Sequence, residues 1–403
     1  MDTDRGPRAP FDWIILTAAN ARQAAACEAQ LAARTGHGPM RGVQGAFAVA
    51  DARDARIGSG AATVLALAAL ARRLAAAHRG RPLEALLGGL RVLLLHSGGD
   101  SRRLPMYAAE GKLFATLPMQ GRGNRCATVF DLLLEDLASL EPRAGGEVLV
   151  GAGDAVLGIA RARLRFEGSG VVGVAQRADL ARASRHGVFV AGPRGGTVAA
   201  FLQKPDAARM RAAGAVGRDG RALVDLGLFS FDPASAVALL RGSGVRVRGG
   251  GVSFARGSLA DRASRAELPP VDLYREVAMA LPGRTTRGAY LAACGGGSLA
   301  RPLGALFDAM RGTPFRCEVA RIAGFLHVGS TREMLDALVD APGGAPARAR
   351  GFGVPCGSFP LATPAVDDTP APRGRGGAES AAPHGGLGAR ARLLELDAVV
   401  SGP

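Results

Sequence analysis

The chain has 403 residues, which is enough for one large α/β domain with an appendage or for two domains. Only 5% of the residues are aromatic, so the core must be built from Leu, Val and Ala, as in parallel α/β sheets. The net charge of +15 does not indicate a nucleic-acid binder, because the arginines are spread along the chain without a basic run or interleaved aromatic residues.

Strand and helix patterns alternate along most of the chain. Apolar runs predict strands, and stretches rich in good helix formers predict the helices between them. The predicted strands are 11–17, 47–50, 90–95, 147–150, 170–175, 187–191, 197–202 and 223–231, and the predicted helices are 18–34, about 58–78 and 129–140. This alternation predicts an α/β fold with a mostly parallel central sheet.

The composition changes near residue 340. Residues 341–391 are rich in Pro, Gly, Ala and Arg without periodicity, which predicts a disordered or linker segment, and residues 392–403 form a short C-terminal piece. We therefore expect a single structured domain over residues 1–340.

The sequence also predicts a cellular location. Five widely spaced cysteines support neither a disulfide framework nor a zinc site, and residues 1–5 are polar, unlike a signal peptide. The longest apolar stretch, residues 61–71, ends at Arg72 and Arg73 and is too short to span a bilayer. We expect a cytoplasmic protein without membrane or nucleic-acid partners, and its oligomeric state stays open.

The most informative motif is a glycine loop that follows the strand at 90–95. Gly98 and Gly99 allow backbone amides to approach phosphate oxygens, and Arg103 and Lys112 could neutralise a triphosphate. The loop is not a Walker motif, because Leu113 follows the lysine where Ser or Thr would stand. Loops at this end of a parallel strand are where α/β proteins bind ligands.

Lysine usage singles out two positions. The chain carries 50 lysine and arginine residues, and two of them, Lys112 and Lys204, are lysines. A compact ammonium fits a tight phosphate pocket that a planar guanidinium would overfill. Two lysines in phosphate-type contexts therefore indicate a functional role more than chance survival.

Other candidates have structural alternatives that the sequence leaves open. Residues 58–63, with Gly58, Ser59, Gly60 and Thr63, form either a phosphate cradle or a helix entry. Asp154, after a strand, is the best Mg²⁺ ligand but could instead cap a turn.

A second group of candidates lies between residues 185 and 229. His186 precedes a predicted hairpin that would deliver Lys204 to the site, and it could equally be a turn residue. Asp225 stands before a glycine, where it could contact a sugar hydroxyl.

Together these segments resemble the GDP-fucose pyrophosphorylase (fucose-1-phosphate guanylyltransferase) family, which is also found fused to a sugar kinase. The matching stretches are FDWIILTAANARQ from Phe11, IGSGAAT from Ile57, LLHSGGDSRRLPMYAAEGKLFATLP from Leu94, GAGDAVL from Gly151, SRHGVFV from Ser184, FLQKP from Phe201, LVDLGLFSFDP from Leu223 and FLHVGSTREML from Phe325. The resemblance implies a Rossmann-like, GT-A-like nucleotidyltransferase domain, with the family's C-terminal β-helix missing or vestigial. It also implies a Mg²⁺-dependent reaction of GTP with L-fucose 1-phosphate that yields GDP-L-fucose and pyrophosphate.

The resemblance implies roles for the candidate residues. Arg103, Lys112 and Lys204 would be catalytic, and Asp154 would bind Mg²⁺. The nucleotide would be bound by two groups of residues, Gly98, Gly99, Asp100 and Ser101 in the loop and Gly58, Ser59, Gly60 and Thr63 near guanine. His186, Lys204 and Asp225 would bind the sugar phosphate.

The sequence departs from the family in several places. Ala61 replaces a glycine of the Gly-Ser-Gly-Gly motif, and His327 stands where related enzymes have a second metal-binding Asp. No sugar-kinase loop is present in the sequence. The alternatives are a non-catalytic protein that binds nucleotide or sugar phosphate on the same scaffold, and a nucleotidyltransferase for another sugar 1-phosphate.

Overall fold

A computed structural model describes residues 9–97, 105–120, 126–159, 164–193, 195–320 and 322–327, together with Arg332. The predicted linker at 341–391 and the C-terminal piece at 392–403 lie outside the described residues.

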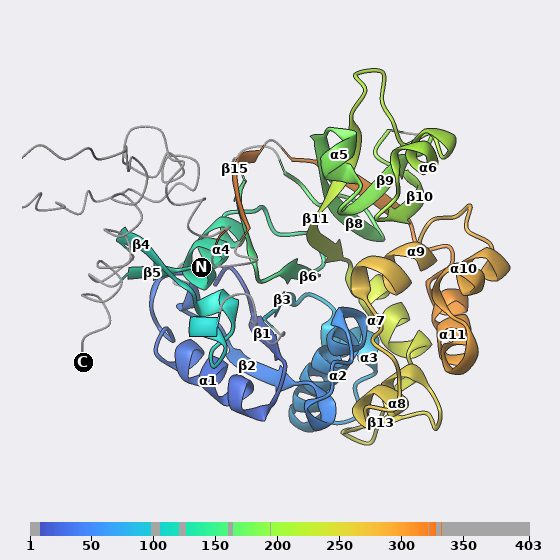
Figure 1. The fold of residues 1–403 in the computed structure, drawn as a ribbon. Coiled ribbons are helices and arrows are strands. Elements are labelled where there is room, and N and C mark those ends of the chain that lie inside the picture. The colour runs from blue at the N-terminus through green and yellow to red at the C-terminus, as the bar shows by residue number, and fades with distance from the viewer. Residues whose placement is uncertain are drawn as a thin grey trace, which may run out of the picture. The chain divides into compact units, whose positions relative to one another are not determined.

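The fold is built on a nine-stranded sheet (Figure 1). Its main path runs β10-β9-β11-β6-β3-β1-β2, and β8 pairs with both β11 and β14. The pairings show that seven strands run in one direction and that β10 and β11 run against them. The strands are β1 (Trp13–Ala18), β2 (Gly45–Ala50), β3 (Arg91–His96), β6 (Glu147–Ala152), β8 (Val171–Ala178), β9 (Gly187–Ala191), β10 (Val198–Gln203), β11 (Ala222–Phe231) and β14 (Phe315–Val319). The predicted α/β class with a large, mostly parallel sheet is confirmed.

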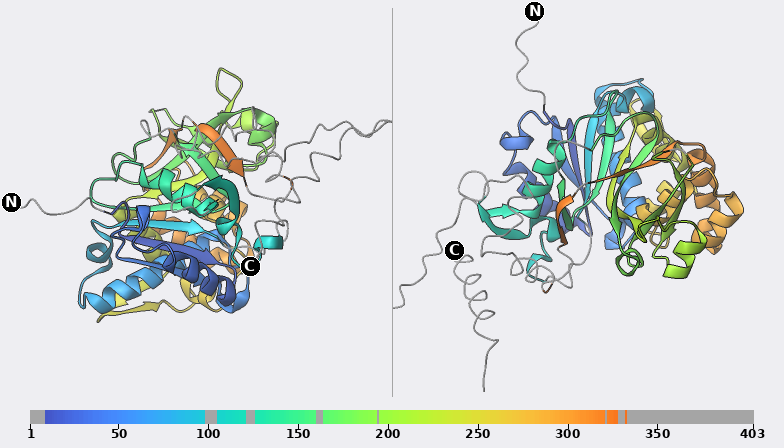
Figure 2. Two further views of the ribbon diagram at one scale, coloured as in Figure 1. Left: turned by 90° about the vertical axis from the view of Figure 1, so that its left-hand side faces the viewer. Right: turned by 90° about the horizontal axis from the view of Figure 1, so that it is seen from above.

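Helices cover both faces of the sheet, as the two further views in Figure 2 show. Alternate residues of the central strands are buried on opposite faces, which explains their nearly continuous apolar sequences. In β3, Leu93 and Leu95 pack with α1 and α4, whereas Val92 and Leu94 pack with the helices of the other face. The first face carries α1 (Ala21–Ala32) and α4 (Val129–Ala138); the second carries α2 (Ser59–Ala77), α3 (Leu83–Leu87), α7 (Pro233–Gly242), α8 (Leu259–Ser264), α9 (Ala278–Ala280), α10 (Arg287–Cys294) and α11 (Ala300–Met310).

Smaller elements complete the described part of the chain. Helices α5 (Leu180–Ala183) and α6 (Ala207–Ala212) pack with β9, β10 and β11 in a third, smaller core. Three two-stranded sheets pair β4 (Thr116–Gln120) with β5 (Cys126–Thr128), β7 (Ala155–Ile159) with β15 (Ile322–His327), and β12 (Val245–Arg248) with β13 (Gly251–Phe254).

Helix α2 is the core helix of the second face. Within the described part of the chain it is the one helix long and apolar enough to cross a membrane by length and composition. In the fold, 67% of its most apolar window is buried against the protein. This burial accounts for the apolar sequence of α2.

A buried ion pair lies at the edge of the sheet where the parallel strands begin. Nε of Arg91, at the start of β3, lies 2.6 Å from Oε1 of Glu147, at the start of β6. The Glu147 side chain is fully buried, and its other oxygen accepts a hydrogen bond from the Ser230 hydroxyl at 2.9 Å. These bonds satisfy the charges at this edge within the protein and fix β3, β6 and β11 relative to one another.

Candidate active site

The polar groups of the candidate site gather at the opposite edge, where the parallel strands end. The carboxyl ends of β1 and β3 carry Thr17 and His96, and β6 leads into a turn that contains Asp154. Strand β11 pairs antiparallel with β6, so its first half, which carries Asp225, reaches the same edge. The structure therefore brings together Asp154 and Asp225, two residues that the sequence analysis selected separately.

His96 joins the end of β3 to helix α2. Its Nδ1 lies 3.3 Å from Thr17 Oγ1, and its Nε2 lies 3.1 Å from Thr63 Oγ1. The Thr63 hydroxyl donates its proton to a carbonyl one turn earlier in α2, at 2.8 Å. Nε2 of His96 is therefore the protonated nitrogen, and Nδ1 accepts from Thr17.

The imidazole of His96 is neutral at physiological pH. Burial lowers its pKa to about 4, although the nearby Asp154 carboxylate opposes this change. A neutral, doubly hydrogen-bonded ring directly before the glycine loop fixes the backbone from which that loop departs.

Asp225 is buried at a break in β11. The pairing of β11 with β8 shifts between residues 225 and 229, and Gly227 in this break has φ of +70°. Oδ1 of Asp225 accepts a hydrogen bond from Gly227 N at 2.9 Å. Burial raises the pKa of Asp225 to about 7; the Gly227 amide lowers it and the Asp272 carboxylate raises it further. Asp225 can therefore be protonated near neutral pH.

A tyrosine and two further carboxylates surround Asp225. Burial, followed by the charges of Asp225, Asp272 and Asp154, raises the pKa of Tyr274 well above its usual value. The Tyr274 hydroxyl donates to the carbonyl of Gly227 at 3.1 Å. The edge is thus strongly acidic, which favours cations or hydroxyl-rich ligands here over an anion without a counterion.

The Gly-Ser-Gly motif at the start of α2 packs against a segment more than 200 residues away. Gly58 has φ of +86°, and a Cβ at this position would overlap the carbonyl oxygen of Val271. The amide groups of Gly60 and Ala61 donate to that same carbonyl at 2.8 and 3.2 Å. A Cβ at Gly60 would lie 3.0 Å from backbone atoms of Asp272 and Leu273.

Ser59 adds two hydrogen bonds to the contact between the Gly-Ser-Gly motif and residues 271–273. Its hydroxyl donates to Asp272 Oδ1 at 2.9 Å and accepts from the amide of Leu273 at 2.9 Å. The local role of the motif is therefore close packing with residues 271–273. The nucleotide-binding role given to Gly58, Ser59, Gly60 and Thr63 stays a prediction.

The predicted hairpin that carries Lys204 is confirmed. Strands β9 and β10 pair antiparallel, and Lys204 N donates to His186 O at 3.0 Å directly beyond their last pair. The backbone of Lys204 is left-handed, with φ of +45°, and its side chain is exposed. Gly187 packs against Asp225, since a Cβ at Gly187 would lie 3.2 Å from the Cβ of Asp225. His186, Lys204 and Asp225 thus belong to one corner of the edge.

Lys112 approaches the edge from the other side. It opens a single 3-10 turn, Lys112–Phe114, after Gly111, whose φ is +80°. A Cβ at Gly111 would lie 2.8 Å from Ser97 Oγ, so this turn rests on the residue that follows β3. A Cβ at Gly153 would meet both the His96 carbonyl at 2.6 Å and the Leu113 side chain at 3.3 Å. The lysine turn, the end of β3 and the Asp154 turn are therefore direct neighbours.

Several predicted residues cannot be placed. Gly98, Gly99, Asp100, Ser101 and Arg103 lie outside the described residues.

His327 is the last residue of β15. The backbone register of β15 with β7 pairs His327 with Ala155, directly after Asp154. The backbone of His327 therefore lies next to the turn that carries Asp154.

The sequence analysis missed Asp272 and Tyr274. Asp272 is the N-cap of the helical segment Leu273–Val277, and its Oδ1 accepts a hydrogen bond from Tyr274 N at 2.7 Å. The amide of Asp272 in turn donates to the carboxylate of Glu276 at 2.6 Å. The available signal was local: Asp272 is a residue type favoured at helix starts, and it follows two prolines and a valine. It could reveal the helix but not its contact with α2.

Comparison with known proteins identifies the family of the chain. A family model described as "Fucose pyrophosphorylase domain" matches residues 84–350. A bifunctional fucokinase/GDP-fucose pyrophosphorylase of Arabidopsis thaliana is 31% identical over 247 residues, which cover 55% of this chain and 23% of that protein. Human fucose-1-phosphate guanylyltransferase is 30% identical over 227 residues, covering 52% of this chain and 35% of that protein. The L-fucokinase/L-fucose-1-P guanylyltransferase of Bacteroides fragilis is 26% identical, and the match covers 47% of this chain and 18% of that protein.

The sheet with polar groups at its carboxyl edge defines an α/β protein compatible with a Rossmann-like fold. Since the family model covers more than half of the chain, the chain belongs to the fucose pyrophosphorylase domain family. The resemblance inferred from the sequence is confirmed. The matched parts span about a third or less of the length of the three relatives.

Proposed function

We propose that this chain is a sugar-1-phosphate guanylyltransferase that forms GDP-L-fucose and pyrophosphate from GTP and L-fucose 1-phosphate. The observation that carries the proposal is the family match over residues 84–350, which includes Lys112, Asp154, His186, Lys204 and Asp225. The names of the relatives add support, since two of the three include the word guanylyltransferase. The nucleotidyltransferase (GT-A-like) character of the domain is part of this proposal.

The reaction needs positioning and charge neutralisation more than proton transfer. An oxygen of the sugar phosphate attacks the α-phosphorus of GTP in line, and the bond from that phosphorus to the α,β-bridging oxygen breaks. Pyrophosphate leaves with the electron pair. Because the attacking phosphate is already anionic near neutral pH, no general base is required.

Two lysines would serve the two phosphates. The turn that Lys112 opens neighbours Ser97, at the end of β3, and the Asp154 turn, so we assign Lys112 to the α-phosphate, where negative charge builds up in the transition state. Gly98, Gly99, Asp100, Ser101 and Arg103 would hold the rest of the triphosphate. Lys204, at the end of its hairpin, would bind the sugar phosphate.

The sugar would lie beside Asp225. This carboxyl group neighbours the His186–Lys204 corner and has a pKa of about 7, so it can donate or accept a hydrogen bond near neutral pH. Guanine would lie near residues 58–63. The Gly60 and Ala61 amides already donate to Val271, so base contacts there would use side chains or the neighbouring segment at 271–274.

A Mg²⁺ ion at this edge would take most of its ligands from the nucleotide and water and few from the protein. Within the described ranges, no three His, Cys, Asp or Glu side chains form a metal-binding group. Mg²⁺ typically takes one or two protein carboxylates and completes its shell with water and phosphate oxygens, and Asp154 offers one carboxylate. When bound, the ion would neutralise phosphate charge.

A substrate panel tests the proposal. GTP, ATP, UTP and CTP are each combined with L-fucose 1-phosphate and with other sugar 1-phosphates, and pyrophosphate release is measured. We expect the highest kcat/KM with GTP and L-fucose 1-phosphate. A different preferred sugar would correct the substrate, and nucleotide binding without release from any pair would make the protein a non-catalytic binder.

A further inference from the structure

The turn that carries Lys112 depends on contacts with neighbouring elements for its position. Residues 112–114 form one 3-10 turn, and the backbone bonds local to it are Gly111 N to Tyr107 O at 2.8 Å, Phe114 N to Gly111 O at 3.3 Å and Ala115 N to Lys112 O at 3.0 Å. A single turn fixes too few backbone angles to be stable by itself. The position of Lys112 must therefore be set by neighbouring elements.

Those neighbours lie on one stripe of helix α1 and the turn after it. Gln23, Cys27, Gln30 and Arg34 are four, three and four residues apart, the spacing that aligns side chains on one face of a helix. Gln23 and Cys27 are buried, and Gln30 and Arg34 are partly buried. We call these four residues the α1 stripe.

The first half of the α1 stripe contacts the residues before Lys112. The side-chain oxygen Oε1 of Gln23 accepts a hydrogen bond from Ala19 N at 2.7 Å, and this bond turns the side-chain nitrogen Nε2 toward Gly111. A Cβ at Gly111 would lie 3.3 Å from that nitrogen. The Cys27 thiol donates to the Glu110 carbonyl at 3.7 Å.

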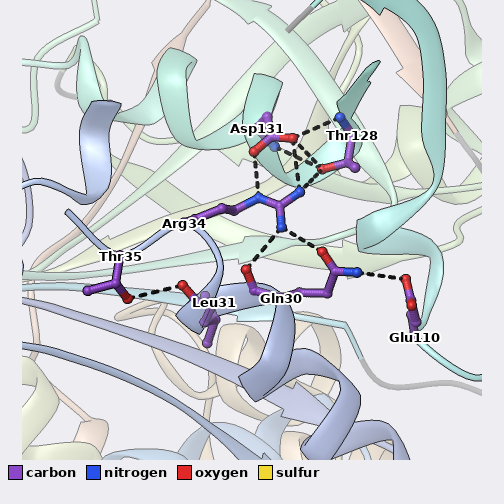
Figure 3. A network of polar contacts seen from close by, with 7 residues as sticks. All are labelled: Gln30, Leu31, Arg34, Thr35, Glu110, Thr128 and Asp131. Carbon is purple, nitrogen blue, oxygen red and sulfur yellow. Dashed lines mark hydrogen bonds and ion pairs between the residues drawn. The ribbon is translucent and has the colours of Figure 1, made fainter. Parts of the chain in front are cut away.

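The second half of the stripe contacts both sides of the lysine turn. Gln30 Nε2 donates to Glu110 Oε2 at 3.1 Å, and Gln30 Oε1 accepts from Arg34 Nη1 at 2.6 Å (Figure 3). The guanidinium of Arg34 lies over the ring of Phe114, 5.3 Å from its centroid. The stripe thus contacts Glu110 and Gly111 on one side of Lys112 and Phe114 on the other.

Arg34 is itself fixed by the start of α4. Its Nε and Nη2 donate to the two carboxylate oxygens of Asp131 at 2.7 and 3.2 Å. Asp131 also accepts from Thr128 N at 2.9 Å as part of the helix cap. Although burial raises the pKa of Asp131, the Arg34 and Thr128 donors hold it below its usual range. This planar, bidentate pair is a rigid anchor that a lysine could not reproduce.

We propose that the α1 stripe positions Lys112 for the α-phosphate, with Arg34 and Gln30 as positioning residues that do not touch the substrate. The inference rests on the proposed function. A catalytic group displaced by about 1 Å can lose on the order of a hundredfold in rate, so a stripe that fixes residues 110–114 controls kcat without contacting the ligand.

The first test compares Arg34→Met with Arg73→Met. Arg73 also lies over a phenylalanine ring, Phe47, at 4.1 Å, but on α2 and outside the α1 stripe. Arg34→Met should lower kcat roughly tenfold or more and change KM for GTP less than about threefold. Arg73→Met should change neither. A second variant, Gln30→Leu, removes the bond to Glu110 and should lower kcat in the same sense if Arg34→Met folds poorly.

A double-mutant cycle separates positioning from general destabilisation. If Arg34 acts through Lys112, Arg34→Met should have little effect on the residual rate of the Lys112→Ala protein. An effect as large in that background as in the wild type, or an unchanged kcat in Arg34→Met, would overturn the inference.

A readout without turnover distinguishes this inference from the proposed function. Because Lys112 and Lys204 are the two lysines of the chain, reductive ¹³C-methylation gives few NMR signals to assign. Arg34→Met should shift the Lys112 signal and leave that of Lys204 in place. If the wild type releases no pyrophosphate, the proposed function fails while these spectra still decide whether Arg34 sets the environment of Lys112. An unmoved Lys112 signal contradicts the inference.

Discussion

Replacing Asp225 by asparagine should make the protein more stable at alkaline pH and less active. Asparagine keeps the side-chain oxygen that accepts from Gly227 N and removes the charge. The pKa of Asp225 is about 7 in the folded protein, against an ordinary value of 3.8, mainly because the carboxyl group is buried. Between these two pH values the unfolded chain releases a proton that the folded protein retains, so the contribution of Asp225 to the free energy of unfolding falls as pH rises.

The size of this effect follows from the two pKa values. Moving a pKa from 3.8 to about 7 corresponds to roughly 4 kcal/mol at 1.36 kcal/mol per pH unit. A new amide N–H without a partner costs about 1–2 kcal/mol at every pH. We therefore expect the variant to be more stable than the wild type by roughly 2 kcal/mol at pH 8, and to lose this advantage at pH 4.

Urea unfolding at both pH values measures the difference directly. Asp219→Asn is the matched control, because Asp219 is exposed and paired with Arg177 at 3.3 Å on the surface. A difference between the Asp225 variant and the wild type that stays the same at pH 4 and pH 8 would refute the reasoning. In the same variant, KM for the sugar 1-phosphate should rise about tenfold while KM for GTP changes little, if this residue contacts the sugar.

Three further substitutions test separate parts of the account. Lys112→Arg keeps the charge but overfills the phosphate pocket, so kcat should fall on the order of a hundredfold with unchanged urea stability; full activity would remove the role given to Lys112. Gly58→Ala should lower the free energy of unfolding by about 2–4 kcal/mol, because φ is +86° and the methyl group meets the Val271 carbonyl, and an unaffected urea midpoint would argue against that close contact. The pKa of His96 is about 4 when folded and 6.5 ordinarily, so on acidification from pH 6.5 to 4 this residue contributes a loss of roughly 1–3 kcal/mol, opposite in sign to the contribution of Asp225 over the same range. Relative to the wild type, His96→Asn should therefore gain stability between pH 6.5 and 4, and a constant difference between the two proteins would contradict the neutral buried ring.

The sheet could be predicted because its signal is local. In β3, each residue from Val92 to Leu95 is buried, and alternate side chains enter different cores, so the strand reads as a continuous apolar run. The hairpin before Lys204 was equally accessible, since its turn residues separate two apolar runs. The sequence analysis predicted no helices between residues 233 and 310, where several are too short to show a clear period: α8 has six residues and α9 has three.

The site could be predicted only in part. Lys112, Asp154, Lys204 and Asp225 stand out as unusual residue types next to strand ends, and topology alone brings those ends to one edge. The partnership of Ser59 with Asp272 joins residues 213 positions apart, and no local pattern encodes it. The same holds for Arg34, because its contacts with Asp131 and Phe114 join segments that are far apart in the sequence.

Product analysis tests the central claim most directly. Purified protein is incubated with Mg²⁺, GTP and L-fucose 1-phosphate, and GDP-L-fucose and pyrophosphate are quantified together in the wild type and in Lys112→Arg. We predict that the wild type forms the two products in equal amounts and that the variant forms almost none while still binding GTP. The absence of GDP-sugar from the wild-type reaction, or equal yields from both proteins, would contradict the account.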